Sequence, residues 1–256
     1  MGFRVLSQRV EVRFPDAWYE LADPEHVWLQ WRLRALANQL RELGVPLDAP
    51  LRALEVGCGQ GALRRQLEDV SAWSVDGADL NEQALRGQEP GRGELLLYDV
   101  HDRLPELAGR YDVVVAFDVI EHVEDAHGFL ASAIFHLRPG GWLLINVPAC
   151  AALWSEYDVA AGHHRRYGKR LLKRELAGLP LELVDQRYWG LSLLPALAVR
   201  KLLTRSGGAP EQVIRRGFRV PGRAAQALLR GVMRLETRLL QRAPVGSSLL
   251  AAARKV

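Results

Sequence analysis

Short apolar runs recur along the chain and are separated by amphipathic stretches. The runs are rich in Val, Ile and Leu, and several remain apolar along their whole length. Strands of this kind that alternate with helices are typical of a parallel sheet covered on both faces. We therefore expect an α/β fold with a doubly wound sheet of seven strands, at residues 51–56, 72–80, 93–100, 111–117, 142–148, 179–189 and 247–256.

The stretches between the runs show helical spacing. Residues 16–43 repeat apolar side chains at this spacing until Gly44 and Pro46 end the pattern. Residues 60–69 and 127–137 follow as two further helices. The chain is predicted to be a single domain, 1–256, with a helical lead-in (1–50), a core (51–189), a basic helical insertion (190–246) and a final strand (247–256).

Charge is distributed unevenly along the chain. The net charge is +4, yet residues 190–256 contain 13 Lys or Arg and only 2 Asp or Glu. A basic segment on an otherwise acidic chain favours an anionic partner such as a membrane surface, a phosphate-bearing acceptor or a nucleic acid. The stretch from Ser206 to Pro210 is predicted to be a flexible break within this segment.

Cysteine use and the N-terminal sequence indicate the compartment. Only Cys58 and Cys150 are present, far apart, which suggests neither a disulfide framework nor a zinc site. The N-terminus has no apolar run of the signal-peptide type, and no uncharged stretch has the length of a membrane span. We therefore expect a cytoplasmic protein with reduced thiols.

The clearest chemical signal is the sequence LEVGCGQG (54–61), which follows the first predicted strand and precedes a helix. Glycines there permit a tight turn and the close approach of a ligand to the backbone. The pattern fits either a dinucleotide or S-adenosylmethionine. Glu55 favours S-adenosylmethionine, because a carboxylate repels a pyrophosphate and attracts a cationic amino group and a sulfonium. A nicotinamide-dependent oxidoreductase is the alternative.

Two further acids stand at the ends of the next predicted strands. Asp79 lies 18 residues after Gly61, about the spacing at which an acid accepts hydrogen bonds from ribose hydroxyls. Asp76 competes for this role, but it lies within the predicted strand. Asp99 closes the third strand, where an acid can accept the adenine amino hydrogens. Because the carboxyl ends of parallel strands share one edge, these acids are expected to border one crevice.

As a set, these residues resemble the class I S-adenosylmethionine-dependent methyltransferases, in particular a small bacterial branch related to ubiquinone-biosynthesis O-methyltransferases. The resemblance rests on LEVGCGQG (54–61), the acid of GADL (77–80), YDVVVAFDVIEHVED (111–125) and LRPGGWLLINVPA (137–149). It extends to EHVWLQWR (25–32) in the lead-in. Two later segments are similar to a polysaccharide- and lipid-associated subset, LWSEYDVAAGHHRRYGKR (153–170) and MRLETRLLQRAPVGSSLLAAARKV (233–256).

The resemblance implies a Rossmann-like sheet whose last strand is antiparallel, with S-adenosylmethionine as the cofactor and S-adenosylhomocysteine as its product. Asp79 is then expected to hold the ribose and Asp99 to approach the adenine. His101 and Asp102 depart from the small or apolar residues that are common after the third strand. The remaining residues implied to contact the cofactor are Glu55, Gly57, Cys58, Gly59, Gly61, Leu80, Val100, Phe117 and Val119.

Methyl transfer to a hydroxyl needs a group that removes a proton, and histidine suits this role at neutral pH. His122 is the first candidate because it follows the fourth predicted strand at the carboxyl edge of the sheet. The related quinone-pathway enzymes are similar at this point, where a carboxylate, a Glu and a His can hold a divalent metal. The corresponding set is Asp118, Glu121 and His122, but Asp118 is shorter than the usual Glu and a metal is not expected.

A second group of candidates follows the fifth predicted strand. His163 and His164 are further candidate bases, and Asp158 can orient one of them. Tandem arginines can fork onto a phosphate or carboxylate, and a tyrosine can stack on a ring. The predicted acceptor contacts are therefore Trp154, Arg165, Arg166 and Tyr167. The alternative is a solvated basic turn.

The insertion at 190–246 intersperses leucines with arginines in two predicted helices. Their apolar faces can pack on the domain as a lid over the acceptor, or dock on an anionic membrane. Both apply if the acceptor is linked to a lipid. The protein would then be cytoplasmic and peripheral at the inner membrane surface.

These features favour methyl transfer to a small-molecule or lipid- or glycan-linked acceptor, with oxygen as the methylated atom. The basic segment suggests a nucleic-acid methyltransferase as the alternative. That alternative is disfavoured because the chain lacks an Asn/Asp-Pro-Pro-aromatic motif and the segment has few aromatic residues for base stacking. The intact set of Glu55, Asp79 and Asp99 disfavours a cofactor-binding scaffold without activity.

Overall fold

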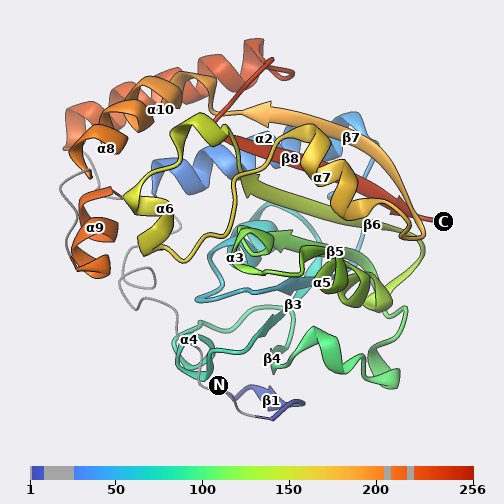
Figure 1. Ribbon diagram of the computed structural model, residues 1–256. Helices are drawn as coiled ribbons and strands as arrows, with labels where there is room; N and C mark the ends of the chain where they lie inside the picture. The colour runs from blue at the N-terminus through green and yellow to red at the C-terminus, as the bar shows by residue number, and fades with distance from the viewer. Residues whose placement is uncertain (1, 9–25, 205–208, 218–221) are drawn as a thin grey trace.

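The strands form one mixed sheet, shown in Figure 1. The computed structural model describes residues 2–8, 26–204, 209–217 and 222–256. Within these residues the strand order is β1-β4-β3-β2-β5-β6-β8-β7. The strands are β1 (Arg4–Val5), β2 (Arg52–Val56), β3 (Ser74–Asp79), β4 (Leu95–Leu97), β5 (Tyr111–Phe117), β6 (Leu137–Pro148), β7 (Leu181–Trp189) and β8 (Ser248–Lys255).

The predicted α/β fold is confirmed, with a difference in the number of strands. All seven predicted strands are present, and the last, β8, is antiparallel to both β6 and β7. The eighth strand is β1, a two-residue segment that pairs with β4 at the edge of the sheet. Both residues of β1 are exposed, so this strand lacks the apolar run by which the others are predicted.

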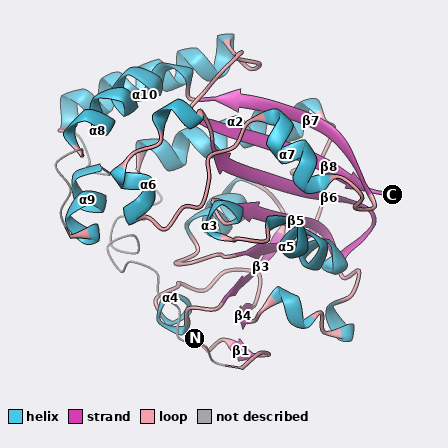
Figure 2. Ribbon diagram, viewed as in Figure 1, coloured by secondary structure: helices cyan, strands magenta, loops and turns pink. Residues whose placement is uncertain are grey.

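Helices cover both faces of the sheet (Figure 2). The helices α2, α3 and α10 pack on one face, and α5 and α7 pack on the other. The predicted lead-in helix over 16–43 corresponds to α2, and residues 9–25 lie outside the described part of the chain. The helices are α2 (Val27–Glu42), α3 (Ala62–Val70), α4 (Glu82–Arg86), α5 (Ala126–Ala133), α6 (Glu156–Ala160), α7 (Lys169–Leu176), α8 (Leu194–Leu203), α9 (Pro210–Gly217) and α10 (Arg223–Leu239).

Successive side chains of each strand point to opposite faces of the sheet, so each strand contributes to two hydrophobic cores. In β5, Val113 and Val115 pack with α2 and α3, whereas Val114 and Ala116 pack with α5 and α7. All four residues are fully buried. Burial on both faces explains why this run is apolar at almost every position instead of alternating with polar residues.

The carboxyl ends of the parallel strands β2 to β6 lie at one edge of the sheet. The loops that follow β2 and β3 are held together there, because the N–H of Gly57 donates to the carbonyl of Ala78 at 2.8 Å. This edge therefore gathers the glycine-rich loop and the acids that follow the strands, as the parallel arrangement predicts.

Three helices, α8, α9 and α10, occupy the predicted insertion between β7 and β8 (Figure 1). The predicted break at 206–210 falls between α8 and α9, and its residues 206–208 lie outside the described part of the chain. The leucine and arginine pattern predicted two of the helices described here, α8 and α10, but not α9.

Glu236 of α10 fixes the start of this insertion. Its buried carboxylate accepts hydrogen bonds from the backbone N–H groups of Gly190 at 2.7 Å, Leu191 at 3.0 Å and Ser192 at 2.7 Å. These groups belong to the turn that leads from β7 into α8. One carboxylate therefore satisfies three backbone donors and ties α10 to the end of the sheet.

We predict that Glu236→Ala lowers the free energy of unfolding by about 3 kcal/mol, because it leaves three N–H groups without their acceptor. Urea denaturation measures this loss, and limited proteolysis should show faster cleavage within 190–246. The matched control is Glu211→Ala on α9, where the side chain is exposed. Equal stability of the two variants would contradict the anchoring role of Glu236.

Candidate active site

The glycine-rich loop after β2 adopts a backbone that only glycine accommodates easily. Gly57, Gly59 and Gly61 have φ angles of 70°, 51° and 75°. A Cβ at Gly57 would lie 2.6 Å from a methyl carbon of Val119. The loop thereby brings its backbone against the segment after β5 and leads directly into α3.

Asp79 lies at the end of β3, beside this loop. Its carboxylate accepts hydrogen bonds from the N–H of Gly59 at 2.7 Å and of Asn81 at 2.8 Å, and burial raises its pKa. The competing acid, Asp76, is engaged by the N–H of Glu94 and the Tyr111 hydroxyl. The geometry therefore keeps Asp79, and not Asp76, as the candidate for the ribose.

Asp99 lies half-buried after β4, where its carboxylate accepts a hydrogen bond from the N–H of His101 at 2.9 Å. Val100 is buried beside it. These two positions, with Gly61, Asp79, Leu80 and Val119, are not among the described residues that line the pocket below. Their contacts with the adenine and ribose stay predictions.

A pocket of about 370 Å³ opens at the carboxyl edge of the sheet. It runs from the glycine-rich loop, past Glu55 and Phe117, to the helices α8 and α10. The apolar lining includes Trp28, Leu197 and Leu229. A cavity of this size, largely apolar with a few converging polar groups, is typical of a small-molecule site.

Two buried carboxylates, Glu55 and Glu121, and the half-buried Asp118 line this pocket near Arg32 of α2. The guanidinium pairs with Asp118, and its positive charge also lowers the pKa values of Glu55 and Glu121. It lies over the rings of Trp28 and Phe117, 5.2 and 5.5 Å from their centroids. The lead-in helix therefore supplies one of the positive charges that line the pocket, beside Arg166 and Arg200.

Burial outweighs Arg32 at these acids. It raises the pKa of Glu55 to about 8 and the pKa of Glu121 well above its usual range. One carboxylate oxygen of each, Oε2, is buried without a hydrogen-bond partner. Both side chains line the pocket, so a cationic ligand group near Glu55 would satisfy a carboxylate that lacks a partner. This arrangement fits the amino group of S-adenosylmethionine.

Asp158 and His163 form a buried pair on the opposite wall. The ring Nδ1 of His163 lies 3.0 Å from Asp158 Oδ1, and Arg166 donates to the same oxygen at 2.7 Å. Burial alone would raise the pKa of Asp158, but the His163 hydrogen bond and the Arg166 charge hold it at about 2. Asp158 is therefore ionised at neutral pH and orients the His163 ring toward the pocket.

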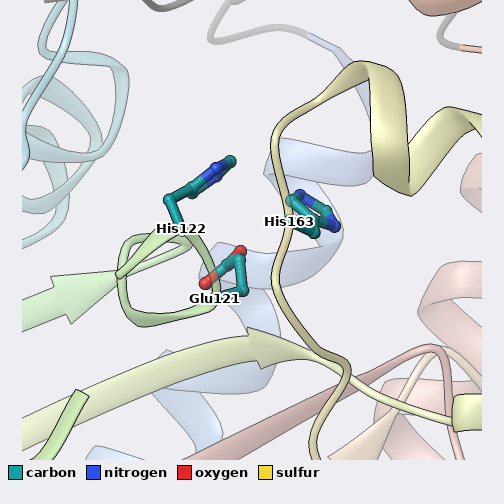
Figure 3. Close-up of side chains that lie close together, drawn as sticks. All are labelled: Glu121, His122 and His163. Carbon is teal, nitrogen blue, oxygen red and sulfur yellow. The ribbon is translucent and has the colours of Figure 1, made fainter. Parts of the chain in front are cut away.

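His122 faces His163, as Figure 3 shows, with the ring centroids 4.8 Å apart. Burial, followed by the nearby His163, lowers the pKa of His122 to about 3. Its imidazole is thus neutral at physiological pH. Two of the three predicted histidines, His122 and His163, line the pocket, whereas His164 is exposed and lies outside the described lining.

Glu121, His122 and His163 offer a possible set of metal ligands, with donor atoms that all lie within 4.8 Å of one another (Figure 3). The orphaned oxygen of Glu121 fits such a group, and Asp158 would orient His163 as a ligand. A divalent ion held there would polarise an acceptor oxygen. The predicted set differs, because the oxygens of Asp118 are taken by Arg32 and Asn146.

The predicted acceptor contacts divide between the pocket and its surroundings. Arg166 lines the pocket but pairs with Asp158. Arg165 points away, donating to the carbonyl of Glu124, and the Tyr167 hydroxyl donates to the carbonyl of Ile120 in the core. Neither of these two, nor Trp154, belongs to the described lining, so their predicted contact with an acceptor finds no support in the pocket.

Sequence reasoning missed Arg32, Tyr157 and Arg200, which the fold brings to the pocket from three different helices. The guanidinium of Arg200 lies 3.9 Å from the ring centroid of Tyr157, and its Nε is buried without a partner. Helical spacing predicted the helices that carry Arg32 and Arg200 but not α6, which carries Tyr157, and no local pattern distinguished the three residues from surface charges and core aromatics.

Comparison with known proteins identifies the family. A family profile described as "Methyltransferase domain" matches residues 26–186, more than half of the chain. The ubiquinone biosynthesis O-methyltransferase of Thiobacillus denitrificans is 34% identical over 118 residues, which cover 43% of this chain and 50% of that protein. The chain thus spans about half the length of the curated relatives it matches.

Solved structures share the fold. The geranyl diphosphate C-methyltransferase of Streptomyces coelicolor, in complex with S-adenosylhomocysteine, is 15% identical with a TM-score of 0.56, and the match covers 92% of this chain and 84% of that one. Phosphoethanolamine N-methyltransferase 2 of Haemonchus contortus is 19% identical with a TM-score of 0.54, covering 86% and 52%. Together with the family profile, these findings show that the chain belongs to the methyltransferase-domain family, as a class I S-adenosylmethionine-dependent methyltransferase.

Proposed function

We propose that this enzyme transfers a methyl group from S-adenosylmethionine to a hydroxyl oxygen of a small or lipid-linked acceptor. One observation carries the proposal: a single pocket is lined by the glycine-rich loop, by Glu55 and by His163, whose ring is held by Asp158. The names of the curated relatives, which are O-methyltransferases, support oxygen as the methylated atom.

The chain divides the work between the two ends of the pocket. Glu55 would hold the amino group of the cofactor, and Asp79 would hold its ribose. When bound, the cofactor supplies a methyl group on a cationic sulfur, and its transfer to a hydroxyl leaves S-adenosylhomocysteine and releases one proton. The apolar lining excludes water from this reaction, so the acceptor oxygen competes with no solvent nucleophile.

His163 receives the proton in this mechanism. Its Nδ1 is held by ionised Asp158, so Nε2 is the nitrogen that accepts the acceptor's proton. The negative charge of Asp158 stabilises the imidazolium that results. His122 was the first candidate from the sequence, but a pKa of about 3 makes it a weaker base, so its ring positions the acceptor.

Arg200 adds a preference for an acidic acceptor. Its guanidinium lies in the pocket, and burial lowers its pKa, which indicates a cation that is incompletely compensated. A phosphate or carboxylate on the acceptor would supply the missing partner of its buried Nε. The acceptor thus combines an apolar body, a hydroxyl and an acidic group.

Mass spectrometry tests the proposal directly. The enzyme is incubated with S-adenosylmethionine carrying a deuterated methyl group and with fractionated cellular lipids and small molecules. The proposal predicts a labelled O-methyl ether. A product labelled on nitrogen or carbon, or a labelled nucleic acid, would instead overturn the assignment of the acceptor.

We predict that Asp79→Ala weakens S-adenosylhomocysteine binding about tenfold or more, because the ribose loses a charged acceptor and the N–H of Gly59 loses its partner. Calorimetric titration measures the change. Asp76→Asn serves as the control, since Asp76 lies deeper in β3 and contacts Glu94 and Tyr111. A larger loss of affinity in the control would show that the ribose acid is misassigned.

We predict that His163→Gln lowers kcat about 100-fold or more while leaving S-adenosylhomocysteine affinity within about twofold, because only the proton acceptor is lost. His122→Gln should lower kcat less. Treatment with EDTA should leave the wild-type rate unchanged if an imidazole, not a bound metal, activates the hydroxyl. The rates are measured with the acceptor found by the labelling screen, and an unaffected kcat in His163→Gln would exclude it as the base.

We predict that Arg200→Gln raises the acceptor KM about tenfold or more and has a smaller effect on kcat. The substitution removes an interaction with the acidic group of the acceptor that is present both in the bound substrate and in the transition state. Lys201→Gln is the matched control on α8, since its ammonium donates to the carbonyl of Ala152 near the surface. Steady-state kinetics separates the two variants. Equal acceptor KM values in the two variants would show that Arg200 does not bind an acidic group of the acceptor.

A further inference from the structure

Helix α10 presents two separate apolar stripes. One includes Met233, which is buried against the domain. The other consists of Leu228, Leu235 and Leu239, which are 68%, 60% and 67% exposed. Their spacing of seven and four residues places these three leucines on one face of the helix. Packing on the domain therefore accounts for only one of the two stripes.

A row of arginines accompanies the exposed leucines. Arg230, Arg234 and Arg238 are spaced four residues apart along α10, and all three are exposed. The segment 190–256 as a whole has 13 Lys or Arg against 2 Asp or Glu. The outward side of α10 thus joins a hydrophobic stripe to a cationic one, as in helices that lie in a membrane interface.

The outward face of α8 is apolar for a different reason. Its two cations are directed elsewhere: Arg200 lies in the pocket over Tyr157, and Lys201 donates to the carbonyl of Ala152. This leaves Val199, Leu202 and Leu203 exposed by 54%, 58% and 69%. An exposed group of large apolar side chains on adjoining helices is unusual on a surface that contacts only water.

The same two helices form part of the pocket wall. Leu197 of α8 and Leu229 of α10 both line it, and the two helices lie close together in Figure 1. The outer face of α8 and α10, defined by Val199, Leu202, Leu203, Leu228, Leu235 and Leu239, therefore lies behind the acceptor end of the pocket.

We propose that this outer face docks on an anionic lipid bilayer. The exposed leucines would become buried among the lipid chains, and the arginines of α10 would pair with anionic headgroups. The row of arginines favours such a bilayer over a neutral apolar partner, which would gain nothing from it. Among the described residues, none of the helices combines the length and hydropathy needed to cross a bilayer, so the docking is peripheral.

Vesicle flotation tests the docking without reference to methyl transfer, so its failure is distinct from a failure of the proposed activity. The full-length protein is mixed at about 0.15 M salt with phosphatidylcholine vesicles, with or without one third phosphatidylglycerol. We expect binding to the anionic vesicles that is about tenfold or more stronger than binding to the neutral ones.

Two variants separate the contributions of the stripes. The triple variant Leu228→Gln, Leu235→Gln, Leu239→Gln should lose about tenfold or more of the vesicle binding. The triple variant Arg230→Gln, Arg234→Gln, Arg238→Gln should lose the preference for anionic vesicles. Unchanged S-adenosylhomocysteine affinity shows that both variants are folded.

Helix α7 offers a matched control, because it is basic and exposed but has no exposed leucine. The variant Arg170→Gln, Lys173→Gln, Arg174→Gln should bind anionic vesicles within about twofold of the wild type. Equal binding of the wild type to neutral and anionic vesicles would overturn the proposal. A second result would also overturn it: the wild type does not bind vesicles but self-associates, and the leucine substitutions abolish this self-association. The outer face would then bind a second copy of the chain.

Discussion

The pocket depends on the buried cation Arg32 beside two buried carboxylates, Glu55 and Glu121, and the half-buried Asp118. Arg32 pairs with Asp118 and lowers the pKa values of Glu55 and Glu121, yet burial keeps the pKa values of all three acids raised. Burial thus disfavours the ionised form of Glu55, and a cationic ligand group beside it would restore that form. The pocket is therefore built to receive a further positive charge, and this constraint distinguishes a sulfonium cofactor from a phosphate-bearing dinucleotide.

The fold brings Glu55 and Asp118 together at the carboxyl edge of the sheet. Glu55 lies near the end of β2, and Asp118 follows β5 with a φ of 56°, in the left-handed region that is rarely occupied by residues other than glycine. Strain of this kind persists where surrounding contacts enforce it. Here Arg32 and Asn146 both bind the Asp118 carboxylate, and Trp189 in turn donates to Asn146. The positions of α2, β5, β6 and β7 are thus linked beside the pocket.

Sequence patterns predicted those features of the protein that depend on residues close together in the chain. Apolar runs predicted seven of the eight described strands, and the glycine-rich loop lies in the pocket, because each of these features depends on neighbours in the chain. The acceptor end depends on contacts between distant segments. The fold brings distant residues to this end of the pocket only when α2, α6 and α8 pack against the sheet; these residues are Arg32, Arg200 and His163 with its partner Asp158. The tandem sequence of Arg165 and Arg166 likewise does not show that Arg165 points away from the pocket. The family profile likewise ends at residue 186, so α8 and α10, which wall the acceptor end, lie beyond the shared part of the chain.

The pocket selects a cationic ligand through Glu55 in this mechanism. Calorimetric titration of S-adenosylmethionine at pH 7.0, in buffers of different ionisation enthalpy, measures the protons that the enzyme releases on binding. With a Glu55 pKa of about 8, the free enzyme carries a proton there that a cationic ligand displaces. We expect the wild-type enzyme to release most of one proton on binding and Glu55→Gln to release far less. Equal proton release by the two proteins, or none by the wild type, would rule out this role of Glu55.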